Sequence, residues 1–238
     1  MEKLVHFSES FQGLSHRENQ DGYLVIEEEE YTIFAVFDGV SRALNPRNGV
    51  DSAIQFLNEH HQDYVSSDSL NLNQMMFSVH QNILQTNIPE SLTTYAIAGF
   101  FNRNSSLWFY SSLGDSRIYR LREHTLTCIT TDDTLWPGSP ILTKCLGSEL
   151  LSVNDFQEGK FIAGEGFLFL ATDGCYLLCE EKSTELTKAF EKDDVLTLNK
   201  TVIRMLKGNN LDDATYILIK PPAYKGDLSK FSIQDNEK

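Results

Sequence analysis

Apolar residues gather along the chain in short runs, bounded by glycine, proline or polar residues. Runs of this length that are rich in β-branched and aromatic residues indicate buried strands. We therefore expect strands at residues 23–26, 31–37, 95–101, 107–112, 117–122, 167–171 and 215–220. The acidic run between the first two, residues 27–30, is typical of a solvated hairpin turn rather than of a ligand site.

A helical period replaces these runs in other segments. Residues 49–65 place Val50, Ala53 and Leu57 at the i, i+3, i+4 spacing of one buried face. The same spacing predicts helices over 73–87, 183–191 and 194–207. Strands thus arrive as neighbouring hairpins and helices in separate pairs, which favours an α+β fold with antiparallel sheets over a doubly wound parallel fold.

The chain of 238 residues is long enough for one well-buried domain and short for two. We expect this domain to span residues 1–222, and the polar residues 223–238 to form a frayed tail. Residues 132–160 carry several prolines and glycines and are expected to form a long irregular surface excursion. Loops of that length in compact domains are often functional.

Composition narrows the classes of partner. The formal charge of −14 argues against a nucleic-acid partner, because such affinity rests on cationic contacts to phosphates. No apolar run has the length of a transmembrane helix, and the N-terminus lacks the features of a signal peptide, so we expect a cytoplasmic protein without a membrane role. The four cysteines are scattered in apolar contexts and are expected to be buried thiols.

Four acidic motifs each adjoin an apolar run. They are Asn19-Gln20-Asp21, Phe37-Asp38-Gly39, Thr172-Asp173-Gly174 and Leu211-Asp212-Asp213. Carboxylates that converge at strand edges repel one another unless a cation joins them. Hard carboxylate oxygens select Mg²⁺ or Mn²⁺. The pattern therefore predicts a metal site, and a catalytic one.

Taken together, the motifs of the chain resemble those of the metal-dependent type 2C protein phosphatases, most closely the bacterial branch that opens with Gly-x-Ser-His. The matching segments occur in family order and extend from about residue 7 to residue 220. They are Gly13–Asp21, Phe37–Gly39, Thr93–Thr94, Gly114–Arg117, Leu142–Gly147, Ala171–Gly174 and Asp212–Thr215.

The resemblance implies a four-layer αββα sandwich, in which two central antiparallel β-sheets are flanked by helix pairs. It also implies two Mn²⁺ or Mg²⁺ ions in a cleft at one end of the sandwich. By the same resemblance, Asp38 would bridge the ions and the Gly39 carbonyl would bind one of them. Asp173 and Asp212 would hold the other ion, and Asp21 would act through bound water.

Four further positions match the family with an alternative beside each. Asp115 would lie near a third, weakly bound metal, or would brace its strand through Arg117. Thr93 and Thr94 match a pair beneath the metal cleft, or are ordinary strand residues. Asp213 competes with Asp212 for the ligand role; the family usually has Asp-Asn here, so Asp212 aligns with the ligand and Asp213 with the asparagine.

The phosphate-binding arginine is the main departure from the family. Many members carry it five residues before the aspartate of the first motif, where this chain has His16 and then Arg17. Successive side chains of a strand point in opposite directions. Either the local backbone is irregular and Arg17 reaches the phosphate, or His16 faces it.

The resemblance implies a protein serine/threonine phosphatase. A hydroxide that bridges the metals would attack the phosphorus atom, so no phosphoenzyme would form. The substrate would be a phosphorylated protein, the product of a Ser/Thr kinase. The alternative is a catalytically silent domain that acts as a regulatory binding module. An aspartyl-phosphate hydrolase is excluded, because its chemistry needs a second aspartate two residues from Asp38, where the chain has Val36 and Val40.

Overall fold

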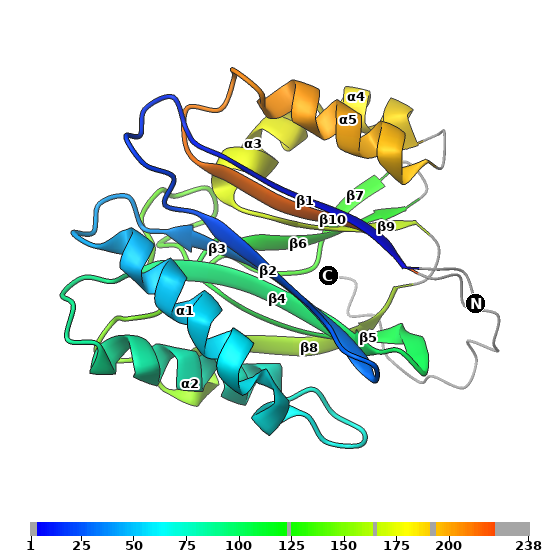
Figure 1. The fold of residues 1–238 in the computed structure, drawn as a ribbon. Coiled ribbons are helices and arrows are strands. Elements are labelled where there is room, and N and C mark those ends of the chain that lie inside the picture. The colour runs from blue at the N-terminus through cyan, green and yellow to red at the C-terminus, as the bar shows by residue number, and fades with distance from the viewer. Residues whose placement is uncertain (1–3, 123–124, 164–165, 191–193, 222–238) are drawn as a thin grey trace.

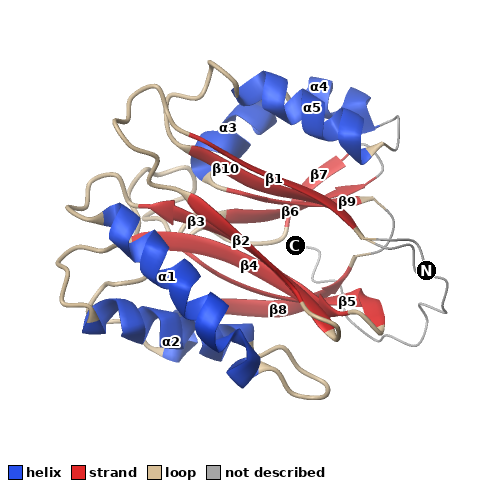
Figure 2. Cartoon of the chain, viewed as in Figure 1, coloured by secondary structure: helices blue, strands red, loops and turns tan. Residues whose placement is uncertain are grey.

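The structure is a computed structural model that describes residues 4–122, 125–163, 166–190 and 194–221. The expected tail, residues 223–238, lies outside the described residues. Two five-stranded antiparallel sheets pack face to face, and helices cover both outer faces (Figure 1). Coloured by secondary structure, the helices form two outer layers around the strands (Figure 2). The α+β sandwich expected from the sequence is confirmed.

The first sheet has the strand order β1-β10-β9-β6-β7. Its strands are β1 (Val5–Phe11), β10 (Ala214–Lys220), β9 (Phe167–Ala171), β6 (Arg117–Arg122) and β7 (Thr125–Cys128). The second sheet has the order β2-β3-β4-β5-β8. Its strands are β2 (Gly22–Glu27), β3 (Tyr31–Gly39), β4 (Thr93–Phe101), β5 (Asn104–Leu113) and β8 (Gln157–Ile162).

The helices form the outer layers. Those against the second sheet are α1 (Pro46–His60) and α2 (Leu72–Gln85), and the short 3-10 helix η1 (His61–Tyr64) continues α1. Those against the first sheet are α3 (Asp173–Glu181), α4 (Ser183–Phe190) and α5 (Val195–Leu206). A second 3-10 turn, η2 (Val153–Asp155), precedes β8. Within the described ranges, no helix is long and apolar enough to cross a membrane.

Three apolar layers hold the sandwich together, and the central strands contribute to two of them. In β3, Phe34 and Val36 point into the layer between the sheets. Ile33, Ala35 and Phe37 point to the layer beneath α1 and α2. Because both faces of this strand are buried, its sequence is a continuous apolar run rather than an alternation. A third cluster joins the first sheet to α3, α4 and α5.

Several elements differ from the sequence-based expectation. Strands β1 and β7 and helix α3 were not predicted, and β8 begins inside the segment 132–160 that was expected to be irregular. The excursion is also less superficial than expected. Leu146 is fully buried, and its backbone exchanges two hydrogen bonds with Thr93.

The strand register brings distant motifs to one end of the sandwich. In the first sheet, Phe11 pairs with Ala214, and Ala171 pairs with both Tyr216 and Arg117. In the second sheet, the end of β3 pairs with the start of β4, whose Tyr95 pairs with the last residue of β5. The β1–β2 and β5–β6 loops cross between the sheets at this end. The segments that carry the acidic motifs are therefore neighbours.

Candidate metal centre

Carboxylates from separate segments of the chain meet at this end of the sandwich. Asp38 is the penultimate residue of β3, and Asp173 is the first residue of α3. Burial raises the pKa of Asp38 well above its ordinary value, and the charges of Asp21, Asp173, Asp115 and Asp212 raise it further. The other four aspartates assigned to the metals from the sequence are thus close enough to act on the carboxyl group of the fifth, Asp38.

Asp173 and Asp38 act on each other within this cluster. Burial raises the pKa of Asp173 to about 6, and the charge of Asp212 adds to the increase, whereas the backbone amide of Gly174 opposes it. Repulsion among these carboxyl groups is therefore part of what raises the pKa of both Asp38 and Asp173.

Asp115 completes the cluster from the β5–β6 loop. Burial raises its pKa to about 7, and the charge of Asp173 adds to the increase. Its Oδ1 atom is buried and has no hydrogen-bond partner among the described residues. The side-chain contacts do not support the alternative role of Asp115, in which it would brace its strand through Arg117. Arg117 pairs with Asp132 instead, through Nε at 2.9 Å and Nη2 at 2.7 Å.

These features fit divalent cations. Burial of a carboxylate oxygen without a partner costs free energy. Holding several carboxyl groups near one another in a low dielectric also costs free energy, unless a positive charge lies among them. The donor set is oxygen throughout, which suits Mg²⁺ or Mn²⁺. Backbone also approaches closely here: a Cβ atom on Gly39 would lie 2.7 Å from the Gln20 carbonyl oxygen.

Asp21 lies deeper than the other acids. Its side chain is 2% exposed, and Thr172 Oγ1 donates to its Oδ2 atom at 2.7 Å. Thr172 Oγ1 in turn accepts a hydrogen bond from the Thr215 amide at 2.9 Å. Burial raises the pKa of Asp21 well above its ordinary value, and the Thr172 hydroxyl opposes that increase. This carboxylate is held by protein groups at the back of the cluster.

The two threonines that match the family pair line the same site. Thr93 Oγ1 donates to the Asp38 carbonyl oxygen at 2.7 Å and so fixes the end of β3. Thr94 Oγ1 lies 2.9 Å from the Oγ atom of Ser116, the residue that follows Asp115. Both hydroxyls therefore contact residues within or next to the acidic cluster.

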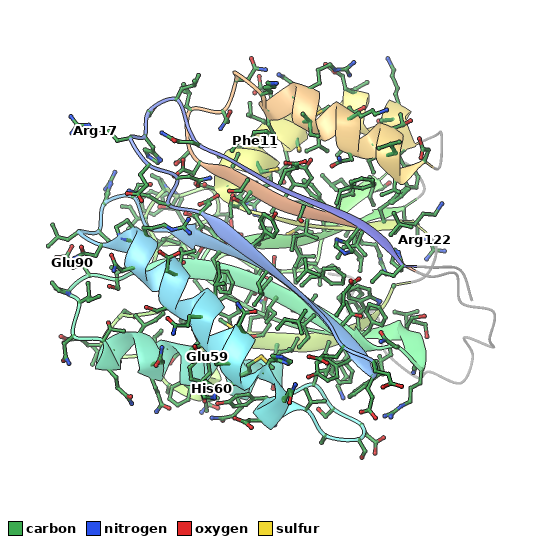
Figure 3. The ribbon with its side chains drawn as sticks, viewed as in Figure 1. Phe11, Arg17, Glu59, His60, Glu90 and Arg122 are labelled. Atoms are coloured by element: carbon green, nitrogen blue, oxygen red, sulfur yellow. The ribbon has the colours of Figure 1, made fainter. Side chains whose placement is uncertain are left out.

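His16 and Arg17 lie in the β1–β2 loop in different environments. His16 is partly buried, and its Nδ1 atom lies 2.9 Å from Asp213 Oδ2 and 3.4 Å from Asp212 Oδ1. Arg17 is exposed, and its side chain points away from the body of the molecule (Figure 3). The structure brings His16 to the cluster and leaves Arg17 in solvent.

Two contributors to the site were not singled out from the sequence. Thr172 stands inside a quoted motif, yet only the structure shows that it holds Asp21. Arg47, at the start of α1, donates through Nη1 to the Asp21 carbonyl oxygen at 2.7 Å. Since both contacts join residues far apart in the sequence, local pattern gives no signal for them.

Comparisons with solved structures identify the fold. A bacterial serine phosphatase matches 94% of this chain and 100% of its own, with a TM-score of 0.80 and 16% sequence identity. The catalytic domain of the serine/threonine protein phosphatase PstP, solved in complex with two manganese ions, matches 92% of this chain and 98% of its own, with a TM-score of 0.71 and 20% identity.

A third neighbour is MsPP, a PPM Ser-Thr phosphatase from Mycobacterium smegmatis solved in complex with cacodylate. It matches 91% of this chain and 97% of its own, with a TM-score of 0.69 and 16% identity. No protein-family model and no curated protein matches the chain. At these identities the likeness establishes the fold, and the resemblance noted in the sequence is confirmed at that level.

Proposed function

We propose that this chain is a metal-dependent phosphatase that hydrolyses phosphoserine and phosphothreonine in proteins without forming a phosphoenzyme. The observation that carries the proposal is the cluster around Asp38, whose carboxyl group feels the charges of four other aspartates. The cluster lies at the end of a fold shared with PstP, which was solved with two manganese ions, and with RsbX, which was solved with magnesium.

The acidic cluster would hold the metal ions. When bound, paired Mn²⁺ or Mg²⁺ ions make water nucleophilic at neutral pH and neutralise the charge on phosphoryl oxygens. The ligands we propose for two ions are Asp38, the carbonyl oxygen of Gly39, Asp173 and Asp212, with Asp21 acting through bound water. The unpartnered oxygen of Asp115 supports a third, weaker site.

The residues around the cluster would position the substrate. We assign the contact to the phosphoryl group to His16 rather than Arg17, because His16 is anchored beside Asp212 while Arg17 points into solvent. Water oxygen bonds to phosphorus as the bond to the serine or threonine oxygen breaks. Inorganic phosphate and a free hydroxyl are the products. An imidazolium at this place can give its Nε2 proton to the leaving alkoxide and become a neutral imidazole.

The substrate class follows from the same proposal. A phosphoserine or phosphothreonine side chain of a protein, placed there by a Ser/Thr kinase, would enter from the exposed side of the cluster. The thiols take no part in this scheme. Cys145, Cys175 and Cys179 are buried, and burial raises the pKa of Cys145 to about 11, whereas the expectation of a buried thiol was wrong for Cys128, which is exposed in β7.

A metal titration with an activity readout tests the proposal. The purified chain should hydrolyse an aryl phosphate and a phosphothreonine peptide only with Mn²⁺ or Mg²⁺, and chelation should abolish turnover. Asp38→Asn and Asp173→Asn should each lower kcat by about 100-fold or more, while Asp68→Asn, which removes the same charge at an exposed position, should not.

Two results would decide against the proposal. Full activity in the double variant Asp38→Asn/Asp173→Asn would refute the assignment of the site. Tight Mn²⁺ binding by calorimetry without turnover of either substrate would favour the catalytically silent binding module.

A further inference from the structure

The Asp213 carboxylate gathers three hydrogen bonds from a single loop almost 200 residues away in the sequence. Its Oδ1 atom accepts from the Gly13 amide at 2.7 Å. Its Oδ2 atom accepts from the Gln20 amide at 2.7 Å and lies 2.9 Å from His16 Nδ1. The side chain is 2% exposed. A buried carboxylate is stable only when its lone pairs are satisfied in this way.

These hydrogen bonds connect both ends of the β1–β2 loop, and His16 between them, to one carboxylate. Gly13 and Gln20 lie near the two ends of the loop and His16 lies between them. Backbone bonds add to this connection, because the amides of Leu14 and Ser15 donate to the carbonyl oxygens of Asn210 and Leu211. The position of the His16 ring is therefore set by the segment that precedes β10 rather than by its sequence neighbours.

The His16 ring also has a defined orientation. A carboxylate accepts hydrogen bonds, so Nδ1 must carry a proton in order to bond with Asp213. The other ring nitrogen, Nε2, then faces substrate or solvent, and it donates to a phosphoryl oxygen only when the ring is doubly protonated. A carboxylate that fixes a histidine in this way determines both its tautomer and the direction of its free nitrogen.

The side chains of His16, Asp212 and Asp213 could instead bind a metal ion, because their ligand atoms lie within 4.8 Å of one another. The hydrogen bonds argue against it. Both oxygens of Asp213 already accept backbone amides, and Nδ1 faces an oxygen at hydrogen-bonding distance.

We propose that Asp213 is a positioning residue: its carboxylate locks the β1–β2 loop and holds the His16 ring with Nδ1–H toward Asp213 and Nε2 toward the substrate phosphate. The proposal rests on the phosphatase function proposed above. It requires a carboxylate rather than an amide at position 213. An asparagine has one acceptor oxygen, and its NH₂ group would face a backbone amide or His16 Nδ1–H.

A double-mutant cycle tests the coupling, with kcat and KM measured on a phosphothreonine peptide at saturating Mn²⁺. Asp213→Asn should lower kcat by about 10–100-fold, the usual loss when a group that orients a functional histidine is removed. His16→Gln should lower kcat similarly. The double variant should lose no more than about twofold beyond His16→Gln, because both changes remove one interaction. Asp68→Asn is the matched control. Losses that multiply in the double variant would overturn the proposal.

A second measurement does not depend on activity. In the wild-type chain labelled with ¹⁵N-histidine, the shifts of the His16 ring nitrogens should show a proton on Nδ1, and Asp213→Asn should change that pattern. An unprotonated Nδ1 in the wild type would overturn the proposal even if the variants fail to fold. If wild-type protein shows no metal-dependent turnover, the phosphatase function fails, while the ring protonation still reports whether the lock exists.

Discussion

Asp173 shows at the scale of one residue how the site opposes the stability of the fold. Burial and the charge of Asp212 raise its pKa from 3.8 to about 6, so the folded protein binds this proton more tightly than the unfolded chain does. Between about pH 4 and pH 6 the unfolded carboxyl is ionised while the folded one is still protonated. The stability that this residue contributes therefore falls as pH rises through that window, and it stays constant above it.

Asp173→Asn should remove this penalty. In the presence of chelator, the variant should gain stability relative to the wild type from pH 4 to pH 6, by on the order of 1–3 kcal/mol. Urea unfolding at a series of pH values measures the difference. Saturating Mn²⁺ should reverse the order, because the wild type then gains the binding free energy. A difference that does not depend on pH would contradict the raised pKa.

Arg17 gives a second prediction at this scale. Because its side chain points into solvent, Arg17→Ala should change kcat/KM for an aryl phosphate by about twofold or less, the effect of one screened surface charge. The matched comparison is His16→Gln at the neighbouring position. A loss of about 100-fold for Arg17→Ala would mean that the arginine turns inward when substrate binds.

The residues of the site differ in how far the sequence could predict them. Asp38 and Asp173 each adjoin a strand-length apolar run, and that local pattern was enough to predict a shared acidic centre. The role of Asp213 was not predictable, because its three partners lie in the β1–β2 loop at the other end of the chain. The choice between His16 and Arg17 likewise depended on the loop backbone, which residue alternation does not describe.

At the scale of elements, prediction succeeded where a segment is buried on one or two complete faces. Strand β3 and helix α5 have continuous or periodic apolar positions, and both were expected close to their observed ranges. Strand β1 was missed because its sequence mixes serine and glutamate with phenylalanine. It lies at the edge of the first sheet, where β10 is its one partner among the described strands. Helix α3 was missed because its nine residues begin inside the acidic motif, at Asp173, without a separate periodic stretch.

The junction of α3 with β10 makes an element-level prediction. A Cβ atom on Gly174 would lie 2.1 Å from the Asp213 carbonyl oxygen, so the helix can begin here only without a side chain. Gly174→Ala should force α3 away from β10, destabilise the protein by about 1–3 kcal/mol or more, and weaken Mn²⁺ binding. Thermal unfolding and calorimetric titration measure the two effects. Leu177→Ala, at an exposed position of the same helix, should change neither.

At the scale of the whole molecule, the acidic cluster joins the two halves of the sandwich. Asp38 belongs to the second sheet, Asp173 and Asp212 flank strands of the first, and Asp115 lies in the loop that crosses from one sheet to the other. Elsewhere the sheets meet mainly through apolar side chains such as Phe34, which impose no charge requirement. If the proposed function is correct, the end of the sandwich that carries the cluster is the part whose cohesion depends on cations.

Hydrogen exchange measured by mass spectrometry should show this dependence. Adding Mn²⁺ to chelator-treated protein should slow exchange together in peptides that cover the β1–β2 loop, the ends of β3 and β5, and the starts of α3 and β10, because ions that join these segments suppress their separate opening. The 27–31 hairpin, which lacks these carboxylates, serves as the internal control. In Asp38→Asn the response should be lost from both sheets together, since that carboxyl group lies next to all the others. Protection confined to one sheet would mean that the cluster does not act as a bridge.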